Sequence, residues 1–450
     1  MKNIDWSKNG AKSKPQYADI VVALDIGTSK IAAVVAEIKE DDQYEVIGLG
    51  SSTSQGMKKG VVVNIESTVS AIQRALEEAE LMADQKIKEV WTGIAGSHIK
   101  GFNSHGMVAV QGQEVVQADI DRVVETAKAI PIPTDQQILH VLNQEFVIDG
   151  QEDVREPLAM SGMRLEVKVH IVTGAVSAAQ NILKCVRRCG LEVGELILQP
   201  LASSMAVLSD DEKDLGVCII DIGGGTSDIA IYTQGAIRHT AVIPIAGDQI
   251  TSDVAMAFRT PTMEAEDIKR RHGCALRGLA DSNETIDVPG VGDRPAKKLS
   301  RQMLSEVIEP RVEELYALVL AEIKKSGLEE LLSSGVVITG GSSAMEGMVE
   351  LGEEVLHMPV RLGTPTYSGP LCEVIRNPRY STSAGLLSAG VSHRRKQKVD
   401  QMKNGSVKTV VSKLKRWFET NGVYLTYYKS KRTKSTYCNK CSTLWSEISK

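Results

Sequence analysis

The sequence predicts an α/β fold in which one strand–turn–strand design is used twice. A continuous apolar run at residues 20–24, typical of a buried central strand, leads into Asp25 and a small polar turn, and residues 31–38 read as the returning strand. The same order of strand, Asp-Ile-Gly, polar turn and strand recurs around Asp221. A third apolar strand, within residues 336–342, also ends in glycines. One design used twice predicts two similar halves.

Size and composition narrow the class of protein. The chain has 450 residues, more than one domain usually contains. Hydrophobic residues make up 42% but aromatic residues only 4%, so the cores must rest on aliphatic side chains and methionine. The net charge of −5 gives no global basic field that would attract nucleic acid. Seven scattered cysteines suit a reducing cytoplasm better than a disulfide framework.

Neither export nor a membrane span is predicted. Residues 1–18 are polar, so we expect a flexible arm there, and they lack the apolar stretch of a signal peptide. No apolar run approaches the roughly 20 residues that a spanning helix needs. Any membrane contact is therefore expected to be peripheral.

Between the two strand pairs, the pattern predicts a helix at 69–82 and a distinct insert at 88–168. Within the insert we expect a strand at 89–92 and a helix at 119–130, and a strand-like stretch at 165–170 returns to the main fold. Farther along, residues 262–325 read as mostly helical and charged, with a break at a Gly/Pro-rich stretch near 286–295.

The glycine turns predict a site for a nucleotide phosphate. Glycine lets backbone N–H groups approach a phosphate closely, because it has no Cβ and accepts positive φ. Asp25 and Asp221 each end a strand, where a carboxylate can hold a magnesium ion through its waters. Lys30 follows the first turn and is placed to neutralise phosphate charge. One such turn alone is more often an ordinary hairpin, so the prediction rests on the pair and on the third glycine turn. The sequence contains neither a P-loop nor a dinucleotide fingerprint.

The hairpins, the glycine pair Gly340-Gly341 and two helical connecting segments, residues 198–205 and 383–387, resemble the actin, Hsp70 and sugar-kinase superfamily. Within it, the chain is similar to the FtsA family of bacterial cell-division proteins over roughly residues 19–420. The stretches that carry this second resemblance are 79–84, 271–275 and 307–311, the approach to the second hairpin at 216–218, and a C-terminal amphipathic helix.

The resemblance implies an actin-like, two-lobed ATPase fold with an inserted subdomain in the first lobe. The first lobe core would comprise 19–87, 169–210 and 379–393; the insert 88–168; the second lobe core 211–250 and 330–378; its outer subdomain 251–329; a linker 394–406; an amphipathic helix 407–419; and an atypical basic tail 420–450.

The resemblance also implies a set of ATP contacts. Phosphates would meet Gly27, Thr28, Ser29, Lys30, Asp221, Gly223, Gly224, Gly225 and Thr226, while Gly340, Gly341 and Ser342 would flank the adenosine and Glu266 and Lys269 would reach the ribose and base. An alternative for Glu266 and Lys269 is a solvated face, because Glu and Lys at i, i+3 often pair on a helix surface.

Catalysis is expected to be weak. Gln199 precedes Pro200 where some relatives carry Glu-Pro. A carboxylate can accept a proton, whereas an amide can only orient a water. We therefore expect slow ATP hydrolysis at most, and a Gln199 that simply packs or caps is an equal alternative. No motif marks a sugar-kinase site.

A C-terminal helix predicts peripheral membrane binding. One apolar stripe at helical spacing contains Val407, Val410, Val411, Leu414, Trp417 and Phe418. Lysines and arginines lie off the stripe, which suits the headgroup boundary of an anionic membrane. The alternative is a helix docked on the protein's own core. The basic tail 420–450 departs from the family pattern, and its single Cys-x-x-Cys lacks the partners of a zinc site.

The function implied by the resemblance is structural. Such a protein would bind ATP and Mg, polymerise at the cytoplasmic face of the inner membrane at the division septum, and tether filaments of FtsZ, whose C-terminal tail docks within residues 250–330. The basic residues Arg270 and Arg271 there are the candidate contacts. The alternative is an ATP-hydrolysing enzyme or chaperone of the same superfamily, although the 63 residues after the second connecting segment leave little room for a peptide-binding domain.

Overall fold

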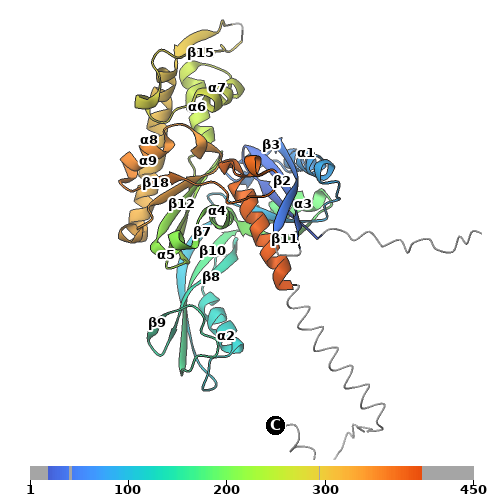
Figure 1. The fold of residues 1–450 in the computed structure, drawn as a ribbon, viewed down its shortest axis with the longest axis vertical. Coiled ribbons are helices and arrows are strands. Elements are labelled where there is room, and N and C mark those ends of the chain that lie inside the picture. The colour runs from blue at the N-terminus through green and yellow to red at the C-terminus, as the bar shows by residue number, and fades with distance from the viewer. Residues whose placement is uncertain (1–18, 40–42, 293, 398–450) are drawn as a thin grey trace, which may run out of the picture. The chain divides into compact units, whose positions relative to one another are not determined.

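In the computed structural model, which describes residues 19–39, 43–292 and 294–397, two five-stranded sheets have the same internal pairing (Figure 1). The first sheet contains β1 (Ile20–Ile26), β2 (Lys30–Ile38), β3 (Tyr44–Thr53), β6 (Glu89–Ile94) and β11 (Glu192–Leu198). The second contains β12 (Val217–Ile222), β13 (Ser227–Thr233), β14 (Ala236–Ile243), β17 (Val336–Thr339) and β18 (Val360–Leu362).

Their strand orders are β11-β6-β1-β2-β3 and β14-β13-β12-β17-β18. β1 and β12 each pair antiparallel with the strand that follows and parallel with a later strand, β6 or β17. Both central strands are continuous apolar runs because both faces of each sheet are covered. The repeated hairpins in the sequence therefore correspond to repeated sheets.

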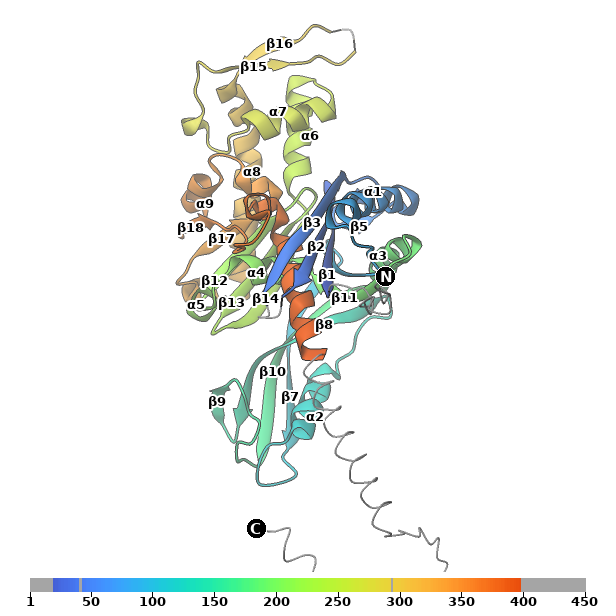
Figure 2. The same ribbon diagram turned by 45° about the vertical axis from the view of Figure 1, so that its right-hand side comes forward.

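Helices cover both faces of the first sheet. On one face, α1 (Ile65–Ala83) and α3 (Val176–Arg188) bury apolar residues against it. Asn64 begins α1 by accepting a 3.0 Å hydrogen bond from the Ser67 backbone N–H, a typical N-cap. On the other face lie α4 (Gln199–Val207) and residues 381–391 of the helix that starts at Ser381. Figure 2 shows this last helix in orange-red beside the first-lobe strands.

An outer group of helices belongs to the second lobe: α6 (Gly247–Phe258) and α7 (Thr262–His272), at the top of Figure 1, with the long α8 (Arg301–Ser326). Helices α5 (Asp210–Leu215), α9 (Met348–Leu356) and α10 (Cys372–Ile375) lie outside this group. The Gly/Pro-rich break that we expected near 286–295 is the region of a hairpin, β15 (Thr285–Val288) with β16 (Lys297–Ser300), which the sequence did not predict. Short elements are β4 (Met57–Lys58), β5 (Val61–Val62), and the 3-10 turns η1 (Arg277–Leu279), η2 (Glu329–Leu331), η3 (Gly341–Ala344) and η4 (Pro378–Tyr380).

The insert is a separate four-stranded sheet with its own core, at the bottom of Figures 1 and 2. Its strands are β7 (Lys100–Ala109), β8 (Gln136–Ile148), β9 (Gln151–Val154) and β10 (Arg164–Ala175), in the order β7-β10-β8-β9, and α2 (Gln117–Lys128) packs on them. The strand at 89–92 that we assigned to the insert is wrong: it is β6, which lies between β1 and β11 in the first sheet. Its buried Val90, Trp91 and Ile94 require a sheet covered on both faces.

The linker predicted at 394–406 begins as a helix, since residues 394–397 continue the helix that starts at 381. Arg394 is drawn to the first sheet by an ion pair of 2.5 Å with Glu89 and by stacking 5.4 Å from the Trp91 ring. The predicted arm, the rest of the linker, the amphipathic helix with its six apolar residues and the basic tail lie outside the described residues. No described helix is both long and apolar enough to cross a membrane.

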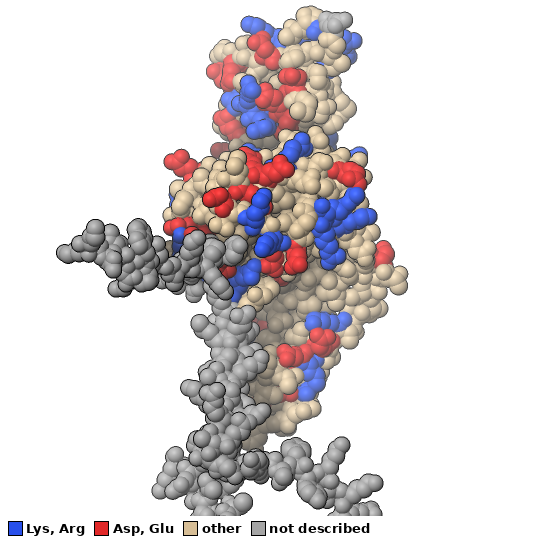
Figure 3. All heavy atoms as spheres, turned by 90° about the vertical axis from the view of Figure 1, so that its right-hand side faces the viewer, with Lys and Arg blue, Asp and Glu red and all other residues tan. Residues whose placement is uncertain are grey.

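Charge is mixed over the surface rather than segregated. On the face that Figure 3 shows, basic and acidic side chains largely alternate over both lobes. This agrees with the modest net charge of −5 and offers no broad basic field on that face.

Candidate functional site

The hairpins β1–β2 and β12–β13 face each other across a cleft of about 980 Å³. In each, the N–H of the first glycine donates a 3.0 Å hydrogen bond to a carbonyl three residues on, Gly27 to Lys30 and Gly223 to Thr226. The two turns therefore have the same local geometry, as the repeated sequence predicted.

Glycine is required where the hairpins meet. A Cβ at Gly224 would lie 1.8 Å from Ser29 Oγ, and one at Gly225 would lie 2.7 Å from Thr28 Oγ1. Any side chain at these positions would fill the space between the lobes. The predicted residues Gly27, Thr28, Ser29, Gly223, Gly224, Gly225 and Thr226 are thus brought together and line the cleft.

Asp25 and Asp221 are buried at the base of the cleft, each with 7% of its surface exposed. Burial raises the pKa of Asp25 to about 6; repulsion from Asp221 adds to this, and attraction to Lys30 opposes it. Burial also raises the pKa of Asp221, whose Oδ2 accepts hydrogen bonds from Ser203 and, at 3.1 Å, from Thr382. Two acids held together in a dry site favour a nearby cation.

Lys30 supplies a cation beside these acids. Its Nζ donates a 2.7 Å hydrogen bond to the Arg379 carbonyl and lies 3.9 Å from the centre of the Tyr380 ring. Burial lowers its pKa to about 8 despite the attraction of Asp25. The ammonium group is therefore held in place and poorly hydrated, which strengthens its attraction for an anion.

The third glycine turn closes one side of the cleft. Gly340 has φ of 90°, and a Cβ there would lie 2.3 Å from Asp221 Oδ1. Ser342 Oγ donates a 2.8 Å hydrogen bond to the Gly223 carbonyl, which ties this turn to the second hairpin. Gly341 lies between them on the cleft surface.

Glu266 and Lys269 also line the cleft, from α7. Lys269 is only 8% exposed, so the alternative of a solvated face does not hold for it. Its Nζ lies 2.6 Å from Glu266 Oε2 and donates hydrogen bonds of 2.7 Å to Thr251 and 3.0 Å to the Gly247 carbonyl. Lys269 thereby fixes α7 against α6.

Arg270 and Arg271 follow on the same helix and are exposed, as expected of partner contacts. Both also belong to the rim of the cleft. Arg271 Nε lies 3.0 Å from Asp267 Oδ1 in an exposed ion pair, which leaves much of the guanidinium accessible.

Gln199 is the first residue of α4 and reaches into the cleft, where its Nε2 lies 3.4 Å from Asp25 Oδ1. It also packs against β6, since a Cβ at Gly93 would lie 2.8 Å from Gln199 Cγ. Both alternatives from the sequence, orienting a water and packing, are compatible with this position.

Among the residues that escaped the sequence prediction, Asp228, Asp248 and Thr382 line the cleft, and Ser203 donates a hydrogen bond to Asp221. Asp228 pairs in register with Asp221, and burial, followed by repulsion from Asp221, raises its pKa to about 7. Its Oδ2 accepts a 2.9 Å hydrogen bond from Thr226. Asp248 accepts from Ser29 across the cleft at 3.2 Å. The tight turn at 223–226 was the available signal for Asp228, because it sets the register of the hairpin.

The family model described as "Cell division protein FtsA" matches residues 218–385, and the model "SHS2 domain inserted in FTSA" matches residues 96–173. A cell division protein FtsA of Pseudomonas aeruginosa is 58% identical over 412 residues, which cover 90% of this chain and 99% of that protein. The chain belongs to the FtsA family of cell division proteins. An FtsA of Escherichia coli is 46% identical over 88% of this chain and 97% of its own length.

Among solved structures, the PilM–PilN type IV pilus biogenesis complex has the same fold. It superposes with a TM-score of 0.59 at 17% identity and covers 82% of this chain and 98% of the compared one. The predicted fold class, an actin-like α/β fold with a subdomain inserted in the first lobe, is confirmed. The FtsA-family relationship and the implied role in cell division are likewise confirmed.

Proposed function

We propose that this FtsA-family protein binds Mg-ATP in the cleft between its lobes, assembles into filaments at the cytoplasmic face of the inner membrane and tethers FtsZ there at the septum. The observation that carries the nucleotide site is the contact of two glycine hairpins beside Lys30 and the buried carboxylates of Asp25 and Asp221. Backbone N–H groups, a fixed ammonium and two carboxylates that favour a cation fit a metal-bound triphosphate.

The residues divide the work of binding. The hairpin glycines let N–H groups approach the phosphates, and Lys30 neutralises charge there. Asp25 and Asp221 would hold Mg through its waters, and the metal would offset the charge of the phosphates. Gly340, Gly341 and Ser342 form the wall that would flank the adenosine, and Glu266 and Lys269 would reach the ribose and base.

Slow hydrolysis is a second, weaker activity of the same site. Gln199 lines the cleft close to Asp25, so its amide can orient a water there. An amide cannot accept the water's proton, which keeps the rate low. The structural role in division therefore does not depend on rapid turnover.

Calorimetry with Mg-ATP tests the site through Asp221→Ala. We expect a loss of affinity of roughly a hundredfold, because an uncompensated charge in a dry site costs several kcal/mol. Asp211→Ala, an exposed aspartate on α5, is the matched control. Equal affinities for the two variants would remove the nucleotide assignment.

The tethering part of the proposal has its own tests. Trp417→Glu should release the full chain from anionic liposomes in co-sedimentation without altering ATP affinity, since each large apolar side chain contributes about 1.5–3 kcal/mol to burial. Charge reversal of Arg270 and Arg271 should weaken binding of an FtsZ tail peptide. Because both arginines also rim the cleft, ATP affinity has to be measured on the same variant.

A further inference from the structure

The insert contacts both lobes, and one of its strands does so by itself. At one point of β8, the His140 Nε2 accepts a 3.0 Å hydrogen bond from the Leu198 backbone N–H. Leu198 ends β11 in the first-lobe sheet and is the residue from which α4 starts. The imidazole must be neutral at Nε2 to accept this bond, and burial lowers the pKa of His140 to about 4.

Four residues farther along β8, Gln144 contacts the second lobe. Its Nε2 donates a 3.0 Å hydrogen bond to the Ile237 carbonyl in β14, the edge strand of the second sheet. The pairing of β8 with β10 skips Gln144, which marks a β-bulge at this residue. The hydrogen bonds place the two side chains: His140 contacts the first lobe and Gln144 the second.

The contact with β14 is close and well paired. Gln144 also donates to Asn103 Oδ1 at 3.1 Å, and Asn103 donates to the Arg238 carbonyl at 3.2 Å. Beside them, His170 and Thr240 form a buried hydrogen bond of 2.9 Å. A Cβ at Gly101 would lie only 2.2 Å from Thr240 Oγ1. This packing leaves Gln144 little freedom to move relative to β14.

Through the hydrogen bond of His140 to Leu198, β8 also contacts the start of α4, a helix that lines the cleft. α4 begins directly after Leu198; its Gln199 lies beside Asp25 in the first lobe, and its Ser203 donates to Asp221 in the second. A movement of one lobe against the other has to disturb the hydrogen bond of His140, that of Gln144, or both.

We propose that β8 is a bridging strand whose positioning residues His140 and Gln144 fix the two lobes relative to each other and so slow the release of nucleotide from the cleft. This inference rests on the proposed nucleotide site. It assigns to the insert a role inside the molecule, in addition to any surface that it offers to other proteins.

A bridge fails when either end is released, and this gives a double-mutant test. His140→Leu and Gln144→Leu should each speed dissociation of a fluorescent ATP analogue from the full chain by roughly three- to tenfold, the range that loss of one hydrogen bond allows. The double variant should be no faster than the faster single variant, since the second substitution releases a strand that is already free at one end. Rates that multiply would overturn the proposal.

Controls come from the same insert. His105 pairs with Glu166 and Gln117 with Asp121, in each case within the insert. His105→Leu and Gln117→Leu should therefore leave the dissociation rate unchanged. His140→Gln keeps an acceptor at similar reach and should restore the slow rate. If the His140→Leu and Gln144→Leu rates equal those of the controls, the bridging role is wrong.

A measurement on the unchanged protein guards against variants that fail to fold. Mg-ATP should slow backbone hydrogen exchange in β8, including residues 138–146, as well as in the cleft hairpins. Protection of the hairpins without protection of β8 contradicts the bridge and leaves the nucleotide site intact. Absence of protection and of ATP binding in both regions rejects the proposed nucleotide site, and the bridge with it.

Discussion

The cleft and the contact between the insert and β14 both bury ionisable side chains, but burial acts on them in opposite directions. In the cleft it raises the pKa of Asp25 to about 6 and that of Asp228 to about 7. In the insert it lowers the pKa values of His140 and His170 to about 4. Burial disfavours the charged form of a side chain. It therefore makes ionisation of the cleft acids unfavourable, whereas it keeps the imidazoles of the insert neutral.

Hydrogen bonding separates the two regions further. His170 has Asn103 and Thr240 as partners at its two ring nitrogens, at 2.7 and 2.9 Å. Asp228 Oδ1, by contrast, is buried without a hydrogen-bond partner among the described residues. Buried polar groups are normally paired. The His170 ring has both of its hydrogen bonds within the chain, whereas the cleft has a buried carboxylate oxygen that a ligand can pair with.

The largest expected effect is at the hairpin contact. Gly224→Val should lower ATP affinity by roughly a hundredfold, because its methyl groups would fill the space beside Ser29 and overpacking costs about 1–3 kcal/mol. Calorimetry measures the affinity. A Cβ at Gly278 meets nothing within 4 Å, so Gly278→Val is the matched control. Equal affinities of the two variants would show that the hairpin contact does not shape the site.

The next effect concerns the insert contact. His170→Leu removes the partner of the buried Thr240 hydroxyl and one of the hydrogen bonds of Asn103, so the free energy of unfolding should fall by about 1–3 kcal/mol. Urea denaturation of the nucleotide-free protein measures this loss. His105→Leu, on the exposed part of the same sheet, should change stability far less. Equal losses would mean that the pairing of His170 contributes nothing special.

The opposite pKa shifts also predict a pH dependence. Because His140 and His170 bind protons less readily when folded, the unfolded chain takes up more protons as the pH falls from about 6.5 to about 4, and stability is lost across that window. The cleft acids contribute with the opposite sign, since their raised pKa values favour the folded state on acidification. Unfolding at several pH values, compared with His140→Gln/His170→Gln, isolates the histidines: the variant should lose less stability on acidification. Parallel pH profiles would contradict this.

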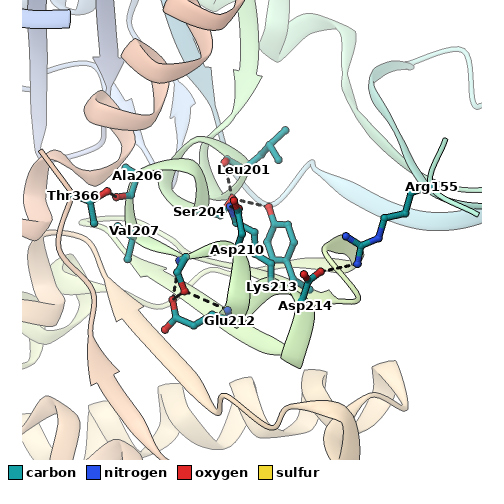
Figure 4. A network of polar contacts seen from close by, with 12 residues as sticks. Arg155, Leu201, Ser204, Ala206, Val207, Asp210, Glu212, Lys213, Asp214 and Thr366 are labelled. Carbon is teal, nitrogen blue, oxygen red and sulfur yellow. Dashed lines mark hydrogen bonds and ion pairs between the residues drawn. The ribbon is translucent and has the colours of Figure 1, made fainter. Parts of the chain in front are cut away.

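The smallest effect is expected at an exposed contact of the same insert. Arg155 forms an ion pair of 2.8 Å with Asp214 of the second lobe, and both side chains are largely open to solvent (Figure 4). Arg155→Ala should therefore change the free energy of unfolding by no more than about 0.5 kcal/mol. A loss as large as that of His170→Leu would show that the insert contact depends on surface charge rather than on its buried network.

The repeated hairpins were predictable because strand, turn and strand are local in sequence. Asp25 and Asp221 could be placed at the strand ends for the same reason. Ser203 and Thr382, which hold Asp221, could not be assigned, since they approach it only after helices far apart in the chain have packed.

The insert shows the same limit. The pattern of β6 is equally compatible with an insert strand or a central strand, and only its pairing with β1 decides between them. The burial of Lys269 depends on Thr251 and Gly247 of another helix. The contacts of His140 and Gln144 connect three parts of the fold, which no local pattern records.

The packing of the helical residues 381–394 on the first sheet has a consequence for synthesis of the chain. Trp91 lies in β6, yet it is covered by Gly390, His393 and Arg394 from the far end of the described chain. During translation, the apolar face of the first sheet around Trp91 stays uncovered until residues 390–394 have left the ribosome. Nascent chains with exposed apolar surface are prone to aggregate. A chain that stops before this helix has been synthesised therefore leaves the Trp91 face of the first lobe uncovered.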